Sequence, residues 1–175
     1  MPGRRRVRHG EGPCRKKDTG ENKMERLMPA YPLFVKDPYF SLWFAGETLN
    51  EGDAVFWHGE PKPLYGTVYC DGKAYGFLGK RDNVKLLKQI GISLTAFGTV
   101  YRFSCEKFDL EAEFLSPLPP DDLELMSLPV CFLNYRILPK AALKDLRVEF
   151  CAEERIAFNT CFDPERSAAT RAGVW

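Results

Sequence analysis

The chain has 175 residues, of which 45% are hydrophobic and 13% aromatic, enough for one domain with a buried core. The formal net charge of +1 argues against nucleic acid or an acidic membrane as a partner. The sequence has no apolar run of the roughly 18 residues that a membrane span needs, and no apolar run after its first arginines. We therefore expect neither a secretory signal nor a membrane anchor, and the simplest prediction is a cytoplasmic protein with reduced thiols.

The start of the chain is basic, because residues 1–23 carry eight Lys/Arg and three Asp/Glu. We interpret residues 1–28 as a disordered, solvated tail. The arginines between Arg4 and Arg8 could instead form a nucleic-acid patch or a localisation signal. Met24 would also make a sensible initiator, in which case Met1–Lys23 would not be translated.

The most distinctive segment, Tyr31–Trp43, holds five aromatic residues, two prolines and one acid. This pattern is too irregular for an amphipathic helix, and the Asp37-Pro38 step favours a turn. Rigid aromatic rings on a bent segment suit the wall of a sugar or amide site, and Trp57 later in the chain is of the same kind. The substrate-facing candidates are Asp37, Tyr39, Ser41, Trp43 and Trp57. The alternative is that Asp37 caps a turn while the aromatic residues pack the core.

Short strands separated by turn residues follow. Asp71-Gly72 lies between two strand-like runs, Gly66–Cys70 and Lys73–Gly79, and predicts a hairpin whose turn needs positive φ at both residues. The apolar run Val84–Phe97 predicts a long strand with a bulge or bend at Gly91.

The clearest alternation is Phe108–Phe114, which predicts a half-buried antiparallel strand. Its three acids, at 109, 111 and 113, could suggest a metal or acid/base set, but a solvated face explains them without any ligand. The proline-rich run Ser116–Asp122 should end the pairing, and Leu123–Met126 could form one helical turn. Pro129–Leu138 is mostly apolar and predicts a strand covered on both faces, and Leu143–Cys151 predicts the next strand.

About nine strands with tight turns indicate an all-β fold, an antiparallel β-sandwich over residues 29–162, followed by an irregular or truncated end over 163–175. The six cysteines are not spaced as a zinc site, so we expect no metal and no cofactor. We interpret Cys131 and Cys151 as small buried hydrophobes and His58 as a structural residue. No residue is assigned a catalytic role.

Seven short motifs follow one another in a fixed order across residues 29–160. They are Pro32–Trp43, Trp57–Gly59, Pro63–Gly66, Val68–Gly72, Tyr75–Gly79, Phe114–Leu123 and Ser127–Val130. Together they resemble the opening region of the glutaminase A family, although each motif alone would be weak evidence.

This resemblance implies the N-terminal, supersandwich-like β-sandwich of a larger hydrolase that converts L-glutamine to L-glutamate and ammonia. Members of that family carry a helical α/α-toroid domain after the sandwich, and this chain has no such helical sequence. The expected catalytic groups for amide hydrolysis would then lie mainly on the missing helical catalytic domain. We therefore expect an incomplete sandwich, inactive alone, that self-associates or depends on a companion chain.

Two other functions stay open at this point. The Asp37–Trp43 segment could supply substrate-facing side chains to a helical domain on another chain, so that the complex is the enzyme. Alternatively, the chain could be a stand-alone carbohydrate- or peptide-binding module with Trp43 and Trp57 as its platform, or part of a glycoside-hydrolase-like enzyme.

Overall fold

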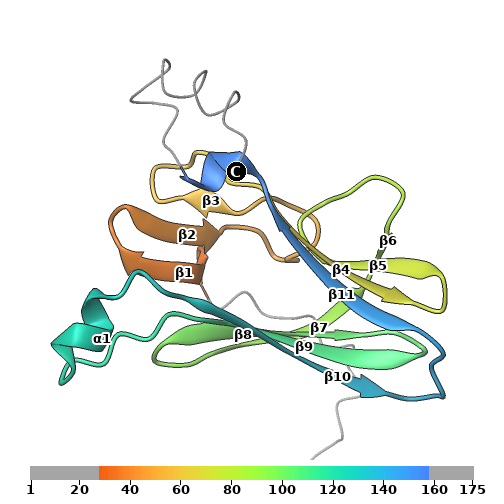
Figure 1. Ribbon diagram of the computed structural model, residues 1–175. Helices are drawn as coiled ribbons and strands as arrows, with labels where there is room; N and C mark the ends of the chain where they lie inside the picture. The colour runs from red at the N-terminus through yellow and green to blue at the C-terminus, as the bar shows by residue number, and fades with distance from the viewer. Residues whose placement is uncertain (1–27, 158–175) are drawn as a thin grey trace, which may run out of the picture.

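The computed structural model describes residues 28–157, and these form an all-β fold of three sheets (Figure 1). Sheet A contains three short antiparallel strands near the start of the chain. They are β1 (Tyr31–Asp37), β2 (Phe40–Phe44) and β3 (Val55–Phe56). The predicted turn at Asp37-Pro38 is confirmed, since it joins β1 to β2.

Sheet B has the strand order β11-β4-β5-β6. Its strands are β4 (Leu64–Cys70), β5 (Lys73–Leu78), β6 (Lys85–Leu86) and β11 (Leu146–Ala152). The predicted β4–β5 hairpin is confirmed, with φ of 50° at Asp71 and 74° at Gly72. This sheet joins distant parts of the described chain, because β11, near its end, pairs antiparallel with β4.

Sheet C has the strand order β10-β9-β8-β7. Its strands are β7 (Lys88–Leu94), β8 (Gly98–Ser104), β9 (Phe108–Leu115) and β10 (Phe132–Pro139). The predicted long strand over Val84–Phe97 is wrong, because this run is divided between β6 of sheet B and β7 of sheet C. The predicted irregularity near Gly91 is confirmed, since the register of β7 against β8 shifts between Gln89 and Gly91. Two short helices complete the described chain, α1 (Leu123–Ser127) after the proline-rich corner and the 3₁₀ turn η1 (Glu154–Ala157).

Sheets A and B lie side by side over one face of sheet C (Figure 1). Aromatic contacts bridge the two layers: the ring centres of Phe34 and Phe114 lie 5.3 Å apart, and those of Tyr75 and Phe108 lie 5.6 Å apart. A core of buried apolar side chains from all three sheets fills the space between the layers. The predicted all-β sandwich is therefore confirmed.

Strand β9 shows why these residues form a half-buried strand. Its four apolar side chains are buried, and its three acids lie on the opposite, partly exposed face. Two of the acids are paired with cations: Asp109 lies 2.6 Å from Lys140, and Glu111 lies 3.0 Å from both Arg102 and Arg136. The outer face is thus a charged, solvated surface, as the period of two predicts.

Two predictions about the later strands are wrong. Strand β10 is not covered on both faces by the described residues, because it is the edge of sheet C and its Tyr135 is 54% exposed. Cys131 and Cys151 are only half-buried, since Cys131 immediately precedes the edge strand β10 and Cys151 lies in the edge strand β11. The predicted N-terminal tail and the irregular end over 163–175 lie outside the described residues.

Within residues 28–157, no helix is long and apolar enough to cross a membrane.

Candidate functional site

The turn between β1 and β2 holds Asp37 in a structural role. Its Oδ1 accepts hydrogen bonds from the backbone N–H groups of Tyr39, at 2.7 Å, and Phe40, at 3.0 Å. A short carboxylate that bonds to the backbone two and three residues ahead stabilises a tight turn. The alternative interpretation, in which Asp37 caps a local turn, describes this geometry.

The aromatic residues of the same segment divide between core and surface. Tyr31 and Phe34 are buried and contact sheet C, whereas Tyr39 at the tip of the turn is 93% exposed. Trp43 is half-buried, and its indole Nε1 donates to Ser41 Oγ at 2.8 Å. Ser41 Oγ is therefore already a hydrogen-bond acceptor, and Trp43 is not a free platform.

Trp57 lies just beyond β3 and is 63% exposed. Strand β3 runs antiparallel to β2, with Val55 opposite Trp43 and Phe56 opposite Leu42. The chain after Phe56 therefore continues toward the start of β2, which is the end of sheet A that carries the β1–β2 turn. The structure therefore places Trp57 and Tyr39 toward the same end of sheet A. This aromatic rim, defined as Tyr39 and Trp57, contains the exposed aromatic residues of the predicted substrate-facing set.

A charged group that the sequence analysis did not identify follows Trp57. Lys62 is buried and lies 3.3 Å from Glu60, and its Nζ also donates to the Arg155 carbonyl at 2.7 Å. His58 contacts the Phe56 ring at 5.1 Å and lies 3.7 Å from Glu60, consistent with a structural histidine. No sequence pattern marks this group, because His58 lies in a turn and Lys62 bonds to a carbonyl far along the chain.

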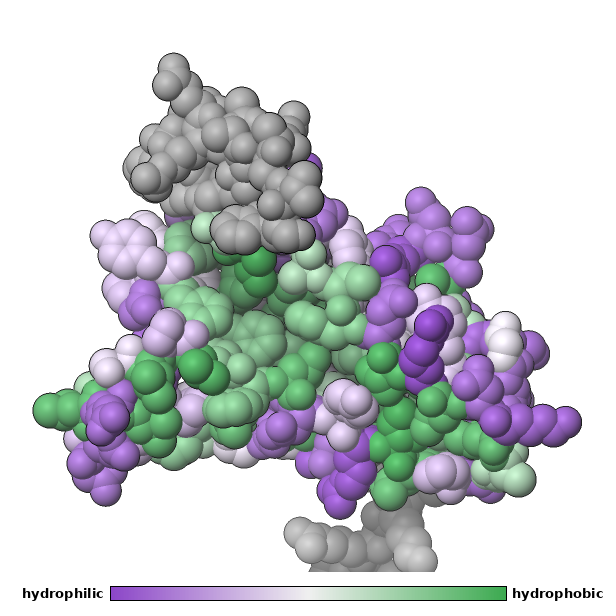
Figure 2. Space-filling view, in the orientation of Figure 1, coloured by the Kyte–Doolittle hydropathy of each residue, from purple (hydrophilic) through white to green (hydrophobic). Residues whose placement is uncertain are grey.

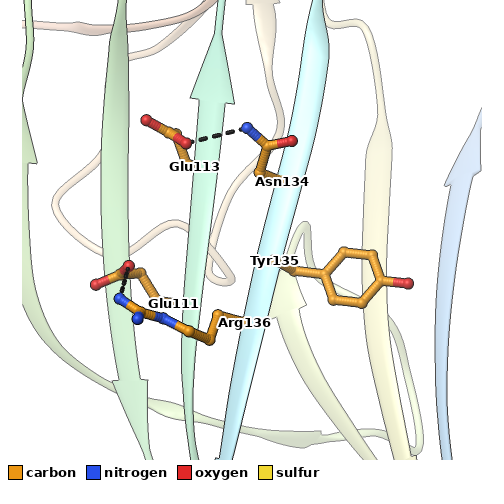
Figure 3. A pocket seen from close by; sticks show the side chains of 5 residues that line it. All are labelled: Glu111, Glu113, Asn134, Tyr135 and Arg136. Carbon is orange, nitrogen blue, oxygen red and sulfur yellow. Dashed lines mark hydrogen bonds and ion pairs between the residues drawn. The ribbon is translucent and has the colours of Figure 1, made fainter.

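The outer face of sheet C carries a shallow pocket between β9 and β10 (Figure 3). Asn134 donates to Glu113 at 3.0 Å, and Arg136 donates to Glu111 at the same distance. These bonds to Arg136, and secondarily to Arg102, hold the pKa of Glu111 below its usual value. The two arginines thus compensate the charge of Glu111, whereas Glu113 accepts a hydrogen bond from a neutral amide. The described residues contain no group of three His, Cys, Asp or Glu side chains placed to hold a metal ion.

The opposite side of β10 faces the interior of the sandwich, and there the two layers do not close. Tyr135 points away from the Glu111 and Glu113 side chains (Figure 3). It pairs in register with buried Ala112, so its side chain belongs to the core-facing row, yet it is more than half exposed.

The same situation recurs on β11. Its core-facing row pairs with the buried positions of β4, but Leu146 and Phe150 are 42% and 43% exposed. In Figure 1, β10 and β11 diverge from their connection over 140–145, and Figure 2 shows apolar side chains gathered between the two layers on this side. We call this surface the front seam; it is formed by Leu133, Tyr135, Ile137, Leu146, Val148 and Phe150.

The front seam is bordered by two strands that each pair on one side only within the described residues. Strand β10 ends the order of sheet C, and β11 ends the order of sheet B. Unpaired edges beside exposed apolar side chains are typical of surfaces that other polypeptide covers. The sequence predicts an incomplete sandwich but not which strands form its open edges, because an apolar strand at an open edge has the same residue pattern as one inside a sheet.

Comparison with known proteins finds two matching family models and one similar protein of known name. Two family models match it: Domain of unknown function (DUF4964) over residues 14–90 and Domain of unknown function (DUF5127) over residues 98–147. Glutaminase A of Aspergillus oryzae (strain ATCC 42149 / RIB 40) is 31% identical over 114 residues. The chain is a homologue of glutaminase A. The alignment covers 61% of this chain and 16% of that relative, so the chain spans about a sixth of the relative's length. No solved structure matches the chain.

Both matched regions contribute to the one sandwich. The DUF4964 region includes sheet A and most of sheet B, and the DUF5127 region supplies β8 to β10 of sheet C. The aromatic rim lies in the first region, and the β10 side of the front seam lies in the second.

Proposed function

We propose that this chain is the non-catalytic β-sandwich portion of a glutaminase A-like hydrolase, and that L-glutamine hydrolysis depends on a helical catalytic domain or a companion chain. The observation that carries the proposal is the 31% identity with glutaminase A. The alignment covers 16% of the relative, and the expected catalytic domain would lie in the remainder.

The local geometry of the candidate residues supports a scaffolding role. The carboxylate of Asp37 accepts two backbone hydrogen bonds, and Ser41 Oγ accepts one from an indole. Amide hydrolysis needs an activated nucleophile or water, a proton donor and donors for the oxyanion. The half-buried Cys131 is also a poor nucleophile, because burial raises the pKa of its thiol.

The aromatic rim supports a role next to a substrate. Exposed rings at the edge of a rigid sheet can form one wall of a site whose reactive groups come from another domain. In this arrangement, Tyr39 and Trp57 would contact the partner domain or its substrate, without taking part in bond breaking.

The first experiment is a glutaminase assay of the purified chain against a heat-killed control. We expect no release of ammonia above that control, and clear turnover by the chain alone would overturn the proposal. The second experiment replaces the aligned 114-residue segment of the Aspergillus oryzae glutaminase A with the matching segment of this chain. A folded chimera that hydrolyses glutamine supports functional equivalence, and a folded but inactive chimera contradicts it.

Within the active chimera, Trp57→Ala tests the aromatic rim. We expect KM to rise or kcat to fall, whereas Phe132→Ala, which removes a partly exposed ring from the outer face of sheet C, should leave both unchanged. Equal kinetics for all three proteins would remove the rim from the proposal.

A second candidate function, a sugar- or peptide-binding module, is favoured by the 63% exposure of Trp57. It is weakened by the hydrogen bond of Trp43 to Ser41, since only one of the two predicted tryptophans is free to stack. Titration of the chain with soluble oligosaccharides and short peptides, followed by tryptophan fluorescence, tests it. A saturable change in the wild type that Trp57→Ala abolishes would support this module.

A further inference from the structure

The backbone of β11 presents one row of hydrogen-bonding groups outward. Asp71 N–H donates to the Asp145 carbonyl, and Glu153 N–H donates to the Pro63 carbonyl, both at 3.2 Å. In an antiparallel ladder the N–H and C=O of one residue point to the same side, and this side alternates along the strand. The odd-numbered residues of β11 therefore bond toward β4, and the N–H and C=O groups of residues 146, 148 and 150 face away from it.

This outward row is self-complementary in antiparallel pairing. If Val148 lies on a two-fold axis, it pairs with Val148 of a second copy, and Leu146 pairs with the second copy's Phe150. These are hydrogen-bonded pairs, and their side chains all lie on the core-facing side of sheet B. The exposed apolar row of β11 would thus be extended by the same row of the second copy.

The same register matches charges on the other face. Arg147 lies opposite the second copy's Glu149, and the symmetry makes this ion pair twice. Within the chain, Arg147 stacks over Tyr69 at 4.4 Å and Glu149 bonds to Arg81 at 2.8 Å, which holds both side chains on the outer face. Opposite charges directly across a strand pair stabilise the pairing, whereas like charges oppose it.

We propose that β11 is a self-association site at which two copies of this chain join antiparallel about Val148, making one continuous sheet from the two B sheets. This surface is separate from the aromatic rim, so the inference does not rest on the proposed function. Strand β10 is the weaker candidate for the same kind of pairing. The bond from Lys140 N–H to the Lys107 carbonyl shows that its even-numbered residues bond toward β9, so the backbone groups of Tyr135 face outward. Pairing of two copies about Tyr135 would place Asn134 opposite Arg136. No ion pair forms there.

The first test measures the oligomeric state of the full chain by sedimentation across the micromolar range. We expect a monomer–dimer equilibrium in the wild type. Each of the variants Arg147→Glu and Glu149→Arg replaces both symmetry-related ion pairs of the dimer by contacts between like charges. Each should therefore raise the dissociation constant of the dimer roughly thirtyfold. The matched control for Arg147→Glu is Lys88→Glu, which also replaces a positive charge by a negative one, but on the edge strand β7 of sheet C. It should leave the dissociation constant unchanged.

Mixing the two variants provides the decisive result. A chain carrying Arg147→Glu complements a chain carrying Glu149→Arg in this register, so the mixture should form heterodimers close to wild-type affinity. A wild type that is monomeric throughout would overturn the proposal. So would dissociation by Lys88→Glu, or a mixture that stays monomeric although both variants have the wild-type circular dichroism spectrum.

A covalent test does not depend on the charge variants folding well. Val148→Cys should form an intermolecular disulfide on mild oxidation, because the Cα atoms of a hydrogen-bonded antiparallel pair lie about 5.5 Å apart. Leu146→Cys is the control, since its own counterpart is not opposite it. If both variants cross-link equally, or neither does, the register is wrong. Formation of mixed species only with an added segment of a glutaminase A-like protein would assign the edge to that partner instead.

Discussion

The ring of Phe114 is the strongest single test of the two-layer core, because it connects sheet C to sheet A. It is fully buried on β9, and its ring centre lies 5.3 Å from that of Phe34 and 5.8 Å from that of Tyr101. Burying a phenylalanine side chain contributes about 1.5–3 kcal/mol, and each ring pair adds about 0.5–1.5 kcal/mol. We therefore expect Phe114→Ala to lower the free energy of unfolding by roughly 3–5 kcal/mol, within the range for large-to-small changes in a core.

The matched control is Phe132→Ala on the neighbouring strand. Phe132 is 47% exposed and lies on the outer face of sheet C, so we expect a loss of about 1 kcal/mol or less. Urea unfolding followed by circular dichroism measures both changes. Equal losses for the two variants, or a loss below about 1 kcal/mol for Phe114→Ala, would show that the layers are not joined as described.

Two further predictions concern turns and close packing. Asp71 accepts bonds from Lys107, then from the Lys144 and Asp145 backbone, which lowers its pKa from 3.8 to about 2. Because the pKa of Asp71 is lower in the folded state than in the unfolded state, its carboxylate stabilises the fold at neutral pH, and this contribution is lost as the pH falls from about 4 to about 2. Asp71→Asn should therefore be less stable than the wild type at neutral pH, and the free energies of unfolding of the two proteins should converge over that range. A difference in stability that does not change with pH would contradict this. A Cβ at Gly66 would lie 2.6 Å from Phe77 Cε2, so Gly66→Ala should cost about 1–3 kcal/mol, whereas Gly91→Ala, which meets no atom within 4 Å, should not share that cost in the same thermal melts.

Much of the fold could be predicted from short patterns because local physics determines it. The alternation over Phe108–Phe114 gave the correct buried face, and Asp71-Gly72 gave the β4–β5 turn because few residue pairs accept positive φ at both positions. Gly91 likewise marked a real irregularity in β7. In each case the signal lies within a few residues of the feature it predicts.

The errors concern what lies across space from a strand. The apolar sequence of β10 is compatible with an inner strand or with an open edge, and only the arrangement of sheets distinguishes them. The candidate site is similarly divided by contacts that sequence cannot show. Trp43 is half-buried and bonds to Ser41, whereas Trp57 lies beyond β3 and is exposed. The Glu60–Lys62 pair was missed because its burial depends on η1, far along the chain.

The pairing of β4 with β11 has a consequence for how the molecule is made. Strand β4 leaves the ribosome long before its neighbour β11 exists, and so do most of the rings that sheet C later covers. Contacts between such distant segments form late and slowly, and a nascent chain in this condition is prone to aggregate. Sheet B is therefore completed only when residues 146–152 have been made, and until then β4 presents an unpaired edge.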